Sequence, residues 1–260
     1  KIIYQSAAKT LSPVTLELGG KSPTIITKNA NLSIAAKRIA FGKFINAGQT
    51  CIAPDYLYVD KTIKDDFINI LKTTINEFYP NFHDDYARIV NDTHYKRITG
   101  LIDEEKVVMS YDKNPQTRLI SPVIMDNVSF DDKVMQEEIF GPVLPIITYD
   151  TLEEAIQTLK TKPKPLALYI FSNNKEDVNI VFSRLPFGTG GINATLDQVV
   201  NPYLPFGGVG NSGIGSYHGK ASFRTFTNPK TYVKRSTLFD PTIAYPPYEG
   251  KLKWIKKILR

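Results

Sequence analysis

An α/β protein with a mostly parallel sheet flanked by helices is the fold that the sequence predicts, and two observations carry this prediction. Strand-forming and helix-forming segments alternate, most clearly at the strand 143–149, the helix 152–159, the strand 166–171 and the helix 175–184. Such alternation is typical of parallel strands joined by crossover helices. The chain also has 260 residues, 42% of them hydrophobic, which is enough for one large domain or two unequal ones.

The remaining elements follow from local apolar periodicity and from turn-forming residues. In chain order we expect a helix over 1–11, a buried strand over 14–18, a strand over 23–27, a helix from Asn29 or Asn31 to Ile45, a strand over 56–60, an amphipathic helix over 62–79, a polar loop around 83–85, a helix over 95–102, extended segments over 107–111 and 119–125, and a strand over 190–194. A late strand over 231–235 is expected at an edge, where it can pair with another subunit.

The positive charge of the chain is concentrated at its end. The net charge is +6, and five cations with no acid lie in the last ten residues, so that residues 1–250 carry only +1. Neither a base-stacking motif nor a finger spacing accompanies these cations. The composition therefore argues against a nucleic-acid partner.

The cysteine and histidine content excludes further classes of protein. A single cysteine cannot form an internal disulfide and favours a reducing, cytoplasmic setting. His83, His94 and His218 show no metal-ligand spacing, so no metal site is expected. The sequence contains no apolar run of 18 residues, so we expect no membrane-spanning helix. Its first residues do not resemble a signal peptide, so we expect no leader.

That single cysteine, Cys51, lies in the connection between a predicted helix and a predicted strand. A thiol in such a turn can act as a nucleophile once it ionises, and backbone amides favour the ionised form. Position alone favours the alternative that Cys51 is a small buried hydrophobic residue. The segment Glu17-Leu18-Gly19-Gly20-Lys21-Ser22-Pro23 changes this balance, because it places a carboxylate and two glycines 34 residues earlier, at the rim of the sheet.

A glycine-rich run occupies residues 203–216. Its Gly-x-Gly patterns suggest a phosphate-binding loop, which requires a preceding strand and a helix that starts at the third glycine. Pro205 precedes the first glycine of the run, and the helical pattern after the run is weak. We therefore expect a tight structural loop near a site.

Four ordered motifs together resemble the aldehyde dehydrogenase superfamily. They are Leu16-Glu17-Leu18-Gly19-Gly20-Lys21-Ser22-Pro23, Gly48-Gln49-Thr50-Cys51, Gln136-Glu137-Glu138-Ile139-Phe140-Gly141-Pro142 and Pro205-Phe206-Gly207-Gly208. Further details resemble its class 3 branch, which includes the fatty aldehyde dehydrogenases: Ala53-Pro54-Asp55-Tyr56, Gly208-Val209-Gly210-Asn211-Ser212-Gly213, Ser216-Tyr217-His218-Gly219-Lys220 and Tyr245-Pro246-Pro247.

The resemblance implies oxidation of an aldehyde to a carboxylate with NAD or NADP. Cys51 matches the nucleophile that forms a thiohemiacetal and then a thioester, and a thiolate suits both attack and departure. Glu17 matches the general base that activates Cys51 or the hydrolytic water, a role for which its pKa must be raised above the ordinary ~4.3. The Cys51 N–H is expected to donate to the oxyanion, together with an asparagine that the family places before the position of Lys1.

The same resemblance assigns residues to the cofactor. Glu138 matches the glutamate that binds the nicotinamide ribose hydroxyls, and Phe140 matches the aromatic residue beside that ribose. Glu137 is the weaker candidate, and without the resemblance both glutamates are ordinary surface acids. Lys21 is expected to be a structural partner near the glycine turn, and His218 is expected to be structural as well.

The resemblance also divides the chain. Residues 1–18 match the last helix and strand of a cofactor-binding domain, 19–212 the catalytic domain, and 213–240 a return segment with a dimerisation strand, which implies a homodimer. Residues 241–260 form a Pro-rich turn and a basic amphipathic helix. We expect residues 251–260 to cover the substrate mouth, to touch an anionic membrane surface, or to pack on their own domain.

Two other functions compete with dehydrogenation. The chain by itself can be a catalytic-domain fragment without dehydrogenase activity, acting as a binding or scaffold protein or as a thiol that hydrolyses activated esters. A papain-like cysteine hydrolase is the third choice, since no histidine has a recognised partner context. The leading hypothesis remains oxidation of a medium-chain or long-chain aliphatic aldehyde, or of an aromatic one.

Overall fold

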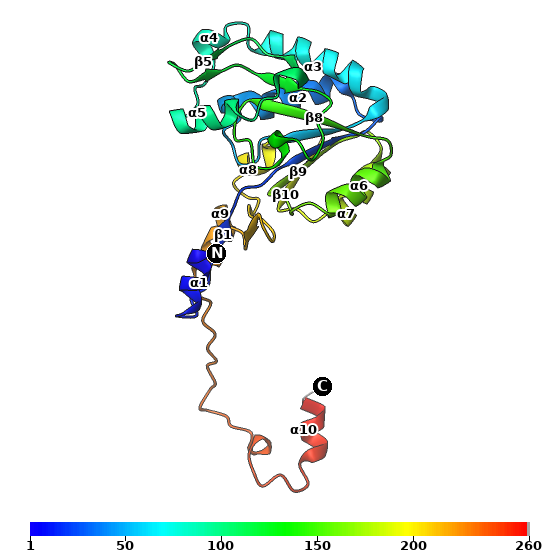
Figure 1. Cartoon of the computed structure of the whole chain (residues 1–260). Helices are drawn as coiled ribbons and strands as arrows, with labels where there is room; N and C mark the ends of the chain where they lie inside the picture. The colour runs from blue at the N-terminus through cyan, green and yellow to red at the C-terminus, as the bar shows by residue number, and fades with distance from the viewer. Residues whose placement is uncertain (259–260) are drawn as a thin grey trace. The chain divides into compact units, whose positions relative to one another are not determined.

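A seven-stranded sheet forms the centre of the larger of two units, which spans residues 1–226 (Figure 1). Its strands follow the order β10 (Thr189–Ile192), β9 (Ala167–Phe171), β2 (Pro23–Ile26), β3 (Tyr56–Asp60), β8 (Val143–Tyr149), β7 (Val123–Met125) and β4 (Val107–Met109). All neighbouring strands run parallel except the outer pair of β4 and β7. The predicted α/β fold with a mostly parallel sheet is confirmed.

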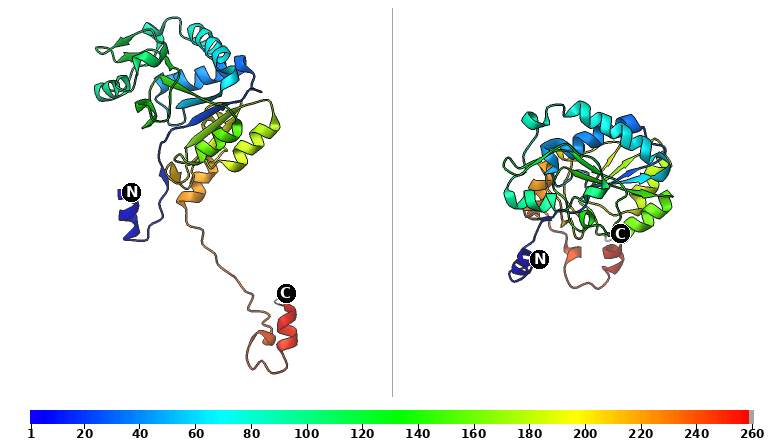
Figure 2. Two further views of the ribbon diagram at one scale, coloured as in Figure 1. Left: turned by 45° about the vertical axis from the view of Figure 1, so that its right-hand side comes forward. Right: turned by 45° about the horizontal axis from the view of Figure 1, so that its top comes forward.

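Helices cover both faces of this sheet, as the ribbons in Figures 1 and 2 show. Helix α2 (Leu32–Phe44) packs against α3 (Lys64–Phe78), and α6 (Leu152–Lys160) packs against α7 (Lys175–Arg184). The chain moves from β2 to β3 in one direction along the sheet and from β8 to β9 in the other. Because crossovers between parallel strands are right-handed, the two helix pairs lie on opposite faces.

The central strands are apolar throughout because both faces of the sheet are covered. Every residue of β2, β3 and β9 is buried, as expected for parallel strands between two helix layers. Helix α2 begins where Asn31 Oδ1 accepts the Ile34 N–H at 3.1 Å, which decides between the two expected capping residues.

Shorter elements complete the larger unit, which ends at Phe226. They are α1 (Ile2–Ala8), β1 (Leu16–Glu17), α4 (Phe82–Asp85), α5 (Asp92–Thr99), β5 (Lys113–Asn114), β6 (Leu119–Ile120), α8 (Asp197–Val200), β11 (Gly213–Ile214), α9 (Gly219–Phe226) and the 3-10 turns Ile45–Gly48, Lys61–Ile63, Glu104–Lys106 and Lys133–Met135. Strand β1 pairs with β11 in a separate antiparallel ribbon.

Several expected elements differ from those observed. The strand expected over 14–18 is only β1, and it is not buried, because its one partner is the ribbon strand β11 rather than the central sheet. The polar loop expected around 83–85 contains the helical turn α4, and the segment 119–125 divides into β6 and β7, which pair with different strands. The glycine-rich run is tight, as expected, since a Cβ on Gly208 would overlap the Ser212 carbonyl oxygen.

The structure describes residues 1–258, and those from Thr227 onward form a second, smaller unit. This unit contains the 3-10 turn Thr242–Ala244 and α10 (Leu252–Ile258), while the expected tail residues Leu259 and Arg260 lie outside the described range. The segment 231–235, expected to pair as a strand with another subunit, has no strand partner within residues 1–258 and is exposed, so its pairing across a dimer stays a prediction. Over the range 1–258, no helix is long and apolar enough to span a membrane.

Candidate active site

Three segments that are far apart in the sequence meet at one edge of the sheet. Residues 17–20 precede β2, residues 51–55 precede β3, and residues 138–141 precede β8. These three strands are adjacent and parallel, so their amino ends lie side by side. The fold thereby brings together the motifs that contain Glu17, Cys51 and Glu138.

The turn that presents Cys51 has an unusual backbone and is held by its own side chains. Asn46 and Ala47 both have positive φ angles, of 53° and 51°. The Gln49 amide donates to the carbonyl oxygens of Asn46 and Arg88, each at 3.1 Å, and its Oε1 accepts the Val90 N–H at 2.9 Å. These bonds fix the turn immediately before the cysteine.

Two glycines allow the three segments to approach one another closely. A Cβ on Gly48, whose φ is +71°, would overlap the carbonyl oxygen of Gly141, which follows Phe140. A Cβ on Gly19 would likewise overlap Glu138 Oε2. At Gly48 the obstacle is backbone, so only glycine permits the approach, whereas a Cβ at Gly19 would displace the end of the Glu138 side chain.

Cys51 is half-buried beside two carboxylates. Burial is the largest cause that raises the pKa of its thiol, followed by the charges of Glu17 and Glu138; the N–H groups of Cys51 and Ile52 act in the opposite direction. The buried Tyr169 hydroxyl donates to the Ile52 carbonyl oxygen at 2.7 Å and holds the far side of the turn. At neutral pH the group is therefore a protonated thiol that needs a base.

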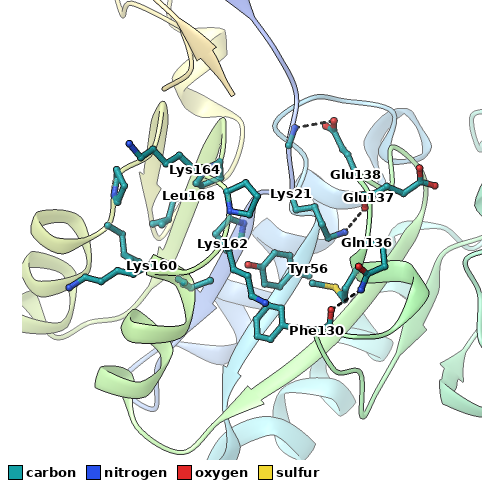
Figure 3. Close-up of a pocket in the computed structure, with 18 residues that line it drawn as sticks. Lys21, Tyr56, Phe130, Gln136, Glu137, Glu138, Lys160, Lys162, Lys164 and Leu168 are labelled. Carbon is teal, nitrogen blue, oxygen red and sulfur yellow. Dashed lines mark hydrogen bonds between the residues drawn. The ribbon is translucent and has the colours of Figure 1, made fainter. Parts of the chain in front are cut away.

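Glu138 is also half-buried, and its Oε2 accepts the Gly20 N–H at 3.0 Å (Figure 3). Burial, and then the charge of Asp55, raise the pKa of this carboxyl to about 7, against the Gly20 N–H and the Lys21 ammonium, which lower it. Glu138 Oε1 has no hydrogen-bond partner within residues 1–258. A carboxylate oxygen open in this way fits a sugar hydroxyl, which is what the ribose of NAD or NADP would offer.

The other two expected site residues are more exposed. Glu17 is the last residue of β1, and its charge raises the pKa of both Cys51 and Glu138, so it lies within electrostatic reach of both. Phe140 is 41% exposed and has a φ of +50° in the loop that follows Glu138.

A pocket of about 440 Å³ adjoins the site at Gly20 and Glu138 (Figure 3). Its wall includes Tyr56 and Phe130, and Lys162 Nζ lies 4.2 Å from the centre of the Phe130 ring. Cys51 and Glu17 do not line it. In the described part of the chain, no cluster of histidine, cysteine and carboxylate side chains could hold a metal ion.

Sequence reasoning missed two residues that hold the Glu138 loop. Asp55 pairs with Lys21 and accepts the Ile139 N–H; its place in the cysteine motif, as a charge between apolar residues, was the available signal. Arg97 donates to the carbonyl oxygens of Glu138 and Ile139 at 3.2 and 2.6 Å, and nothing in its surface-helix pattern indicated this. The three bonds of Lys21 agree with its expected structural role.

The profile of the aldehyde dehydrogenase family matches residues 1–232. The chain belongs to the aldehyde dehydrogenase family. Its relatives include the 4,4'-diaponeurosporen-aldehyde dehydrogenase of Staphylococcus aureus (strain NCTC 8325 / PS 47), which is 50% identical over 100% of this chain and 58% of the relative. The dimeric NADP-preferring aldehyde dehydrogenase of Rattus norvegicus is 45% identical over 97% of this chain and 57% of the relative. These relatives and aldehyde dehydrogenase family 3 member A2 of the same animal confirm the class 3 resemblance.

Solved structures of aldehyde dehydrogenases show the same fold. The substrate-bound state of Staphylococcus aureus AldH matches with a TM-score of 0.96 and 49% identity, over 100% of this chain and 58% of that one. An indole-3-acetaldehyde dehydrogenase in complex with NAD+ matches with a TM-score of 0.79 and 28% identity, over 90% of this chain and 50% of that one. The chain thus spans somewhat more than half the length of the curated relatives that it matches.

Proposed function

We propose that this chain supplies the catalytic part of an enzyme that oxidises a medium-chain or long-chain aliphatic aldehyde, or an aromatic one, to the carboxylate with NAD or NADP. One observation carries the proposal. The single thiol of the chain, Cys51, lies close enough to Glu17 and Glu138 for both carboxylates to raise its pKa, and each carboxylate lies in a segment that precedes a different neighbouring strand. Relatives that are named for aldehydes, for NAD+ and for NADP support the reaction class.

In this proposal Cys51 attacks the aldehyde carbon and forms a thiohemiacetal, which becomes a thioester and is then hydrolysed. Glu17 is the base that takes the thiol proton or activates the water, because its exposed carboxylate lies within electrostatic reach of Cys51. The Cys51 N–H donates to the oxygen that develops negative charge. The bound nicotinamide ring supplies the hydride acceptor.

Glu138 and Phe140 are the proposed cofactor contacts of this chain. The open Glu138 Oε1 would accept a ribose hydroxyl, and the Phe140 ring would lie beside that ribose. Residues 1–18 would complete a cofactor-binding domain, 19–212 the catalytic domain, and 213–240 a dimerisation segment, in keeping with a relative named as dimeric. Residues 251–260 are proposed to cover the substrate mouth or to touch an anionic membrane.

One observation favours a second candidate function. Because the chain spans 58% of its Staphylococcus relative, the 260 residues by themselves can form a binding or scaffold protein with residual esterase activity. Calorimetric titration of this chain with NAD separates the two candidates. Micromolar binding would support the dehydrogenase assignment for the chain itself, and no binding would support the second candidate.

The test of the leading proposal is aldehyde-dependent NADH formation by a protein in which this chain is joined to a cofactor-binding part. Wild type, Cys51→Ser and Cys51→Ala are compared with a saturated long-chain aldehyde. Because the thiol provides the covalent step, we expect turnover to fall at least ~1,000-fold in both variants. Equal turnover in Cys51→Ala and wild type would contradict the mechanism.

A further inference from the structure

The Lys21 ammonium is bonded to the segment that leads to Glu138 and uses all of its hydrogen-bonding capacity. An ammonium has three N–H donors, and Nζ contacts Asp55 Oδ2, the Val134 carbonyl oxygen at 2.9 Å and the Glu137 carbonyl oxygen at 2.8 Å. Only 17% of the side chain is exposed. A side chain held by three acceptors from two other segments has little freedom to move.

Asp55 makes two further hydrogen bonds besides its ion pair with Lys21. Its Oδ1 accepts the Ile139 N–H at 3.0 Å, and its own N–H donates to the Ser22 carbonyl oxygen at 2.9 Å. The carboxylate is 5% exposed. One ion pair therefore joins the segment that follows Glu17, the segment that follows Cys51 and the loop that carries Glu138.

The pair grips the backbone on both sides of Glu138. Lys21 Nζ donates to the carbonyl oxygen of residue 137, and Asp55 Oδ1 accepts the N–H of residue 139. The backbone of residue 138 is therefore held on both sides. The side chain of Glu138 is then directed to the Gly20 N–H. That placement needs support, because Asp55 and Glu17 both repel the Glu138 carboxylate.

We propose that Lys21 and Asp55 are a positioning pair that holds the Glu138–Phe140 loop against the Glu17 segment and the Cys51 turn. Buried ion pairs are poor devices for stability alone, since desolvation offsets much of their attraction. A pair that bonds three segments carrying site residues also fixes their positions relative to one another. That this helps Glu138 to bind a cofactor rests on the proposed function; that it holds the loop in place does not.

A second ion pair in the chain provides a matched control. Lys64 and Asp126 pair at 2.8 Å, with 17% and 11% of their side chains exposed. They connect the start of α3 with the end of β7, away from the residues of the candidate site. Lys64→Met therefore removes a comparable charge pair without touching the Glu138 loop.

The test is amide hydrogen exchange in the 260-residue chain. The Gly20 N–H donates to Glu138 and not to Lys21 or Asp55, so its protection reports whether Glu138 stays in place. We expect this amide, corrected for its intrinsic rate, to exchange at least ~10-fold faster in Lys21→Met and at the wild-type rate in Lys64→Met. The protection of amides in β3 and β8 checks that each variant is folded. Asp55→Asn, which keeps the shape of the side chain, is the second variant and is expected to release the same amide.

A double-mutant cycle on the thiol provides an independent readout. Glu138→Gln removes one carboxylate near Cys51 and is expected to speed its alkylation by iodoacetamide several-fold at pH 8. In the Lys21→Met background the same change should have little effect, because Glu138 has already moved away. Wild-type protection of Gly20 in both Lys21→Met and Asp55→Asn, or an equal effect of Glu138→Gln in both backgrounds, would overturn the proposal. Neither readout depends on dehydrogenase activity, so failure of the proposed function leaves this test unaffected.

Discussion

Lys43 shows how strongly single residues near the site are perturbed. It lies in the last turn of α2 and is fully buried, and no hydrogen bond or ion pair of its Nζ is observed within residues 1–258. Burial lowers the pKa of Lys43 to about 8; the charge of Asp55 acts against this and the charge of Lys21 adds to it. Hydrophobic periodicity cannot predict such a residue, because a lysine in an amphipathic helix is ordinarily exposed.

We predict that Lys43→Met stabilises the chain at pH 7. The folded state releases the Lys43 proton at a pKa of about 8 and the unfolded state at 10.5, so wild-type stability should rise between these pH values. A difference of about 2.5 units corresponds to roughly 3 kcal/mol as an upper bound. Urea unfolding at pH 7 and pH 10.5 measures the effect, and Lys37→Met, an exposed change in the same helix, is the control.

The gain from Lys43→Met should shrink at pH 10.5, where the buried amine of the folded wild type is neutral and the amine of the unfolded chain has lost about half of its protons. A variant that is less stable than wild type at pH 7 would show that the ammonium has a favourable partner. In that case Lys43 would belong to the charge network of Lys21 and Asp55 and not merely lie beside it.

At the scale of elements, the 3-10 turn before Cys51 depends on Gly48. Its φ of +71° and its contact with the Gly141 carbonyl oxygen both exclude a side chain. Gly215 has a similar φ of +78°, but a Cβ there would meet only Thr15 at 3.5 Å, an ordinary contact. A substitution of Gly215 therefore measures backbone strain alone, whereas one of Gly48 measures strain together with steric overlap.

Gly215→Ala should lower the free energy of unfolding by about 1 kcal/mol, the cost of a positive φ for alanine. Gly48→Ala should lower it by about 3 kcal/mol or more, because the new methyl group also displaces the loop at Gly141. Chemical denaturation of both variants measures the difference. Equal losses would mean that the turn and the Glu138 loop are not in contact.

Elements with strong local signals were predicted well. The bounds expected for β3, β8 and α7 match the structure, because continuous apolar runs and capping residues mark them. The strand expected over 231–235 needs a partner strand from another subunit, and the single chain offers none, so this expectation stays a prediction. Strand β1 was placed correctly but expected to be buried, since the sequence does not indicate that its partner is β11.

At the scale of the whole molecule, the candidate site is assembled from segments that are far apart in the sequence. Glu17 lies 34 residues before Cys51, and Glu138 lies 87 residues after it. The motifs indicated the family, and with it the residues to consider. Three features of the site could not be predicted from the motifs: Glu138 is half-buried, Asp55 accepts the Ile139 N–H, and Arg97 donates to the Ile139 carbonyl oxygen. They depend on the order of β2, β3 and β8 in the sheet.

The most direct test of this convergence is the pH dependence of Cys51 alkylation in the 260-residue chain, where Cys51 is the only thiol. We predict that the Cys51 pKa lies above that of an ordinary cysteine and falls in both Glu17→Gln and Glu138→Gln, because each variant removes a negative charge that disfavours the thiolate. Glu137→Gln, an exposed neighbour paired with Arg97, is the control and should leave it unchanged. A Cys51 pKa that is the same in wild type, Glu17→Gln and Glu138→Gln would contradict the account, because the three residues would then not share one site.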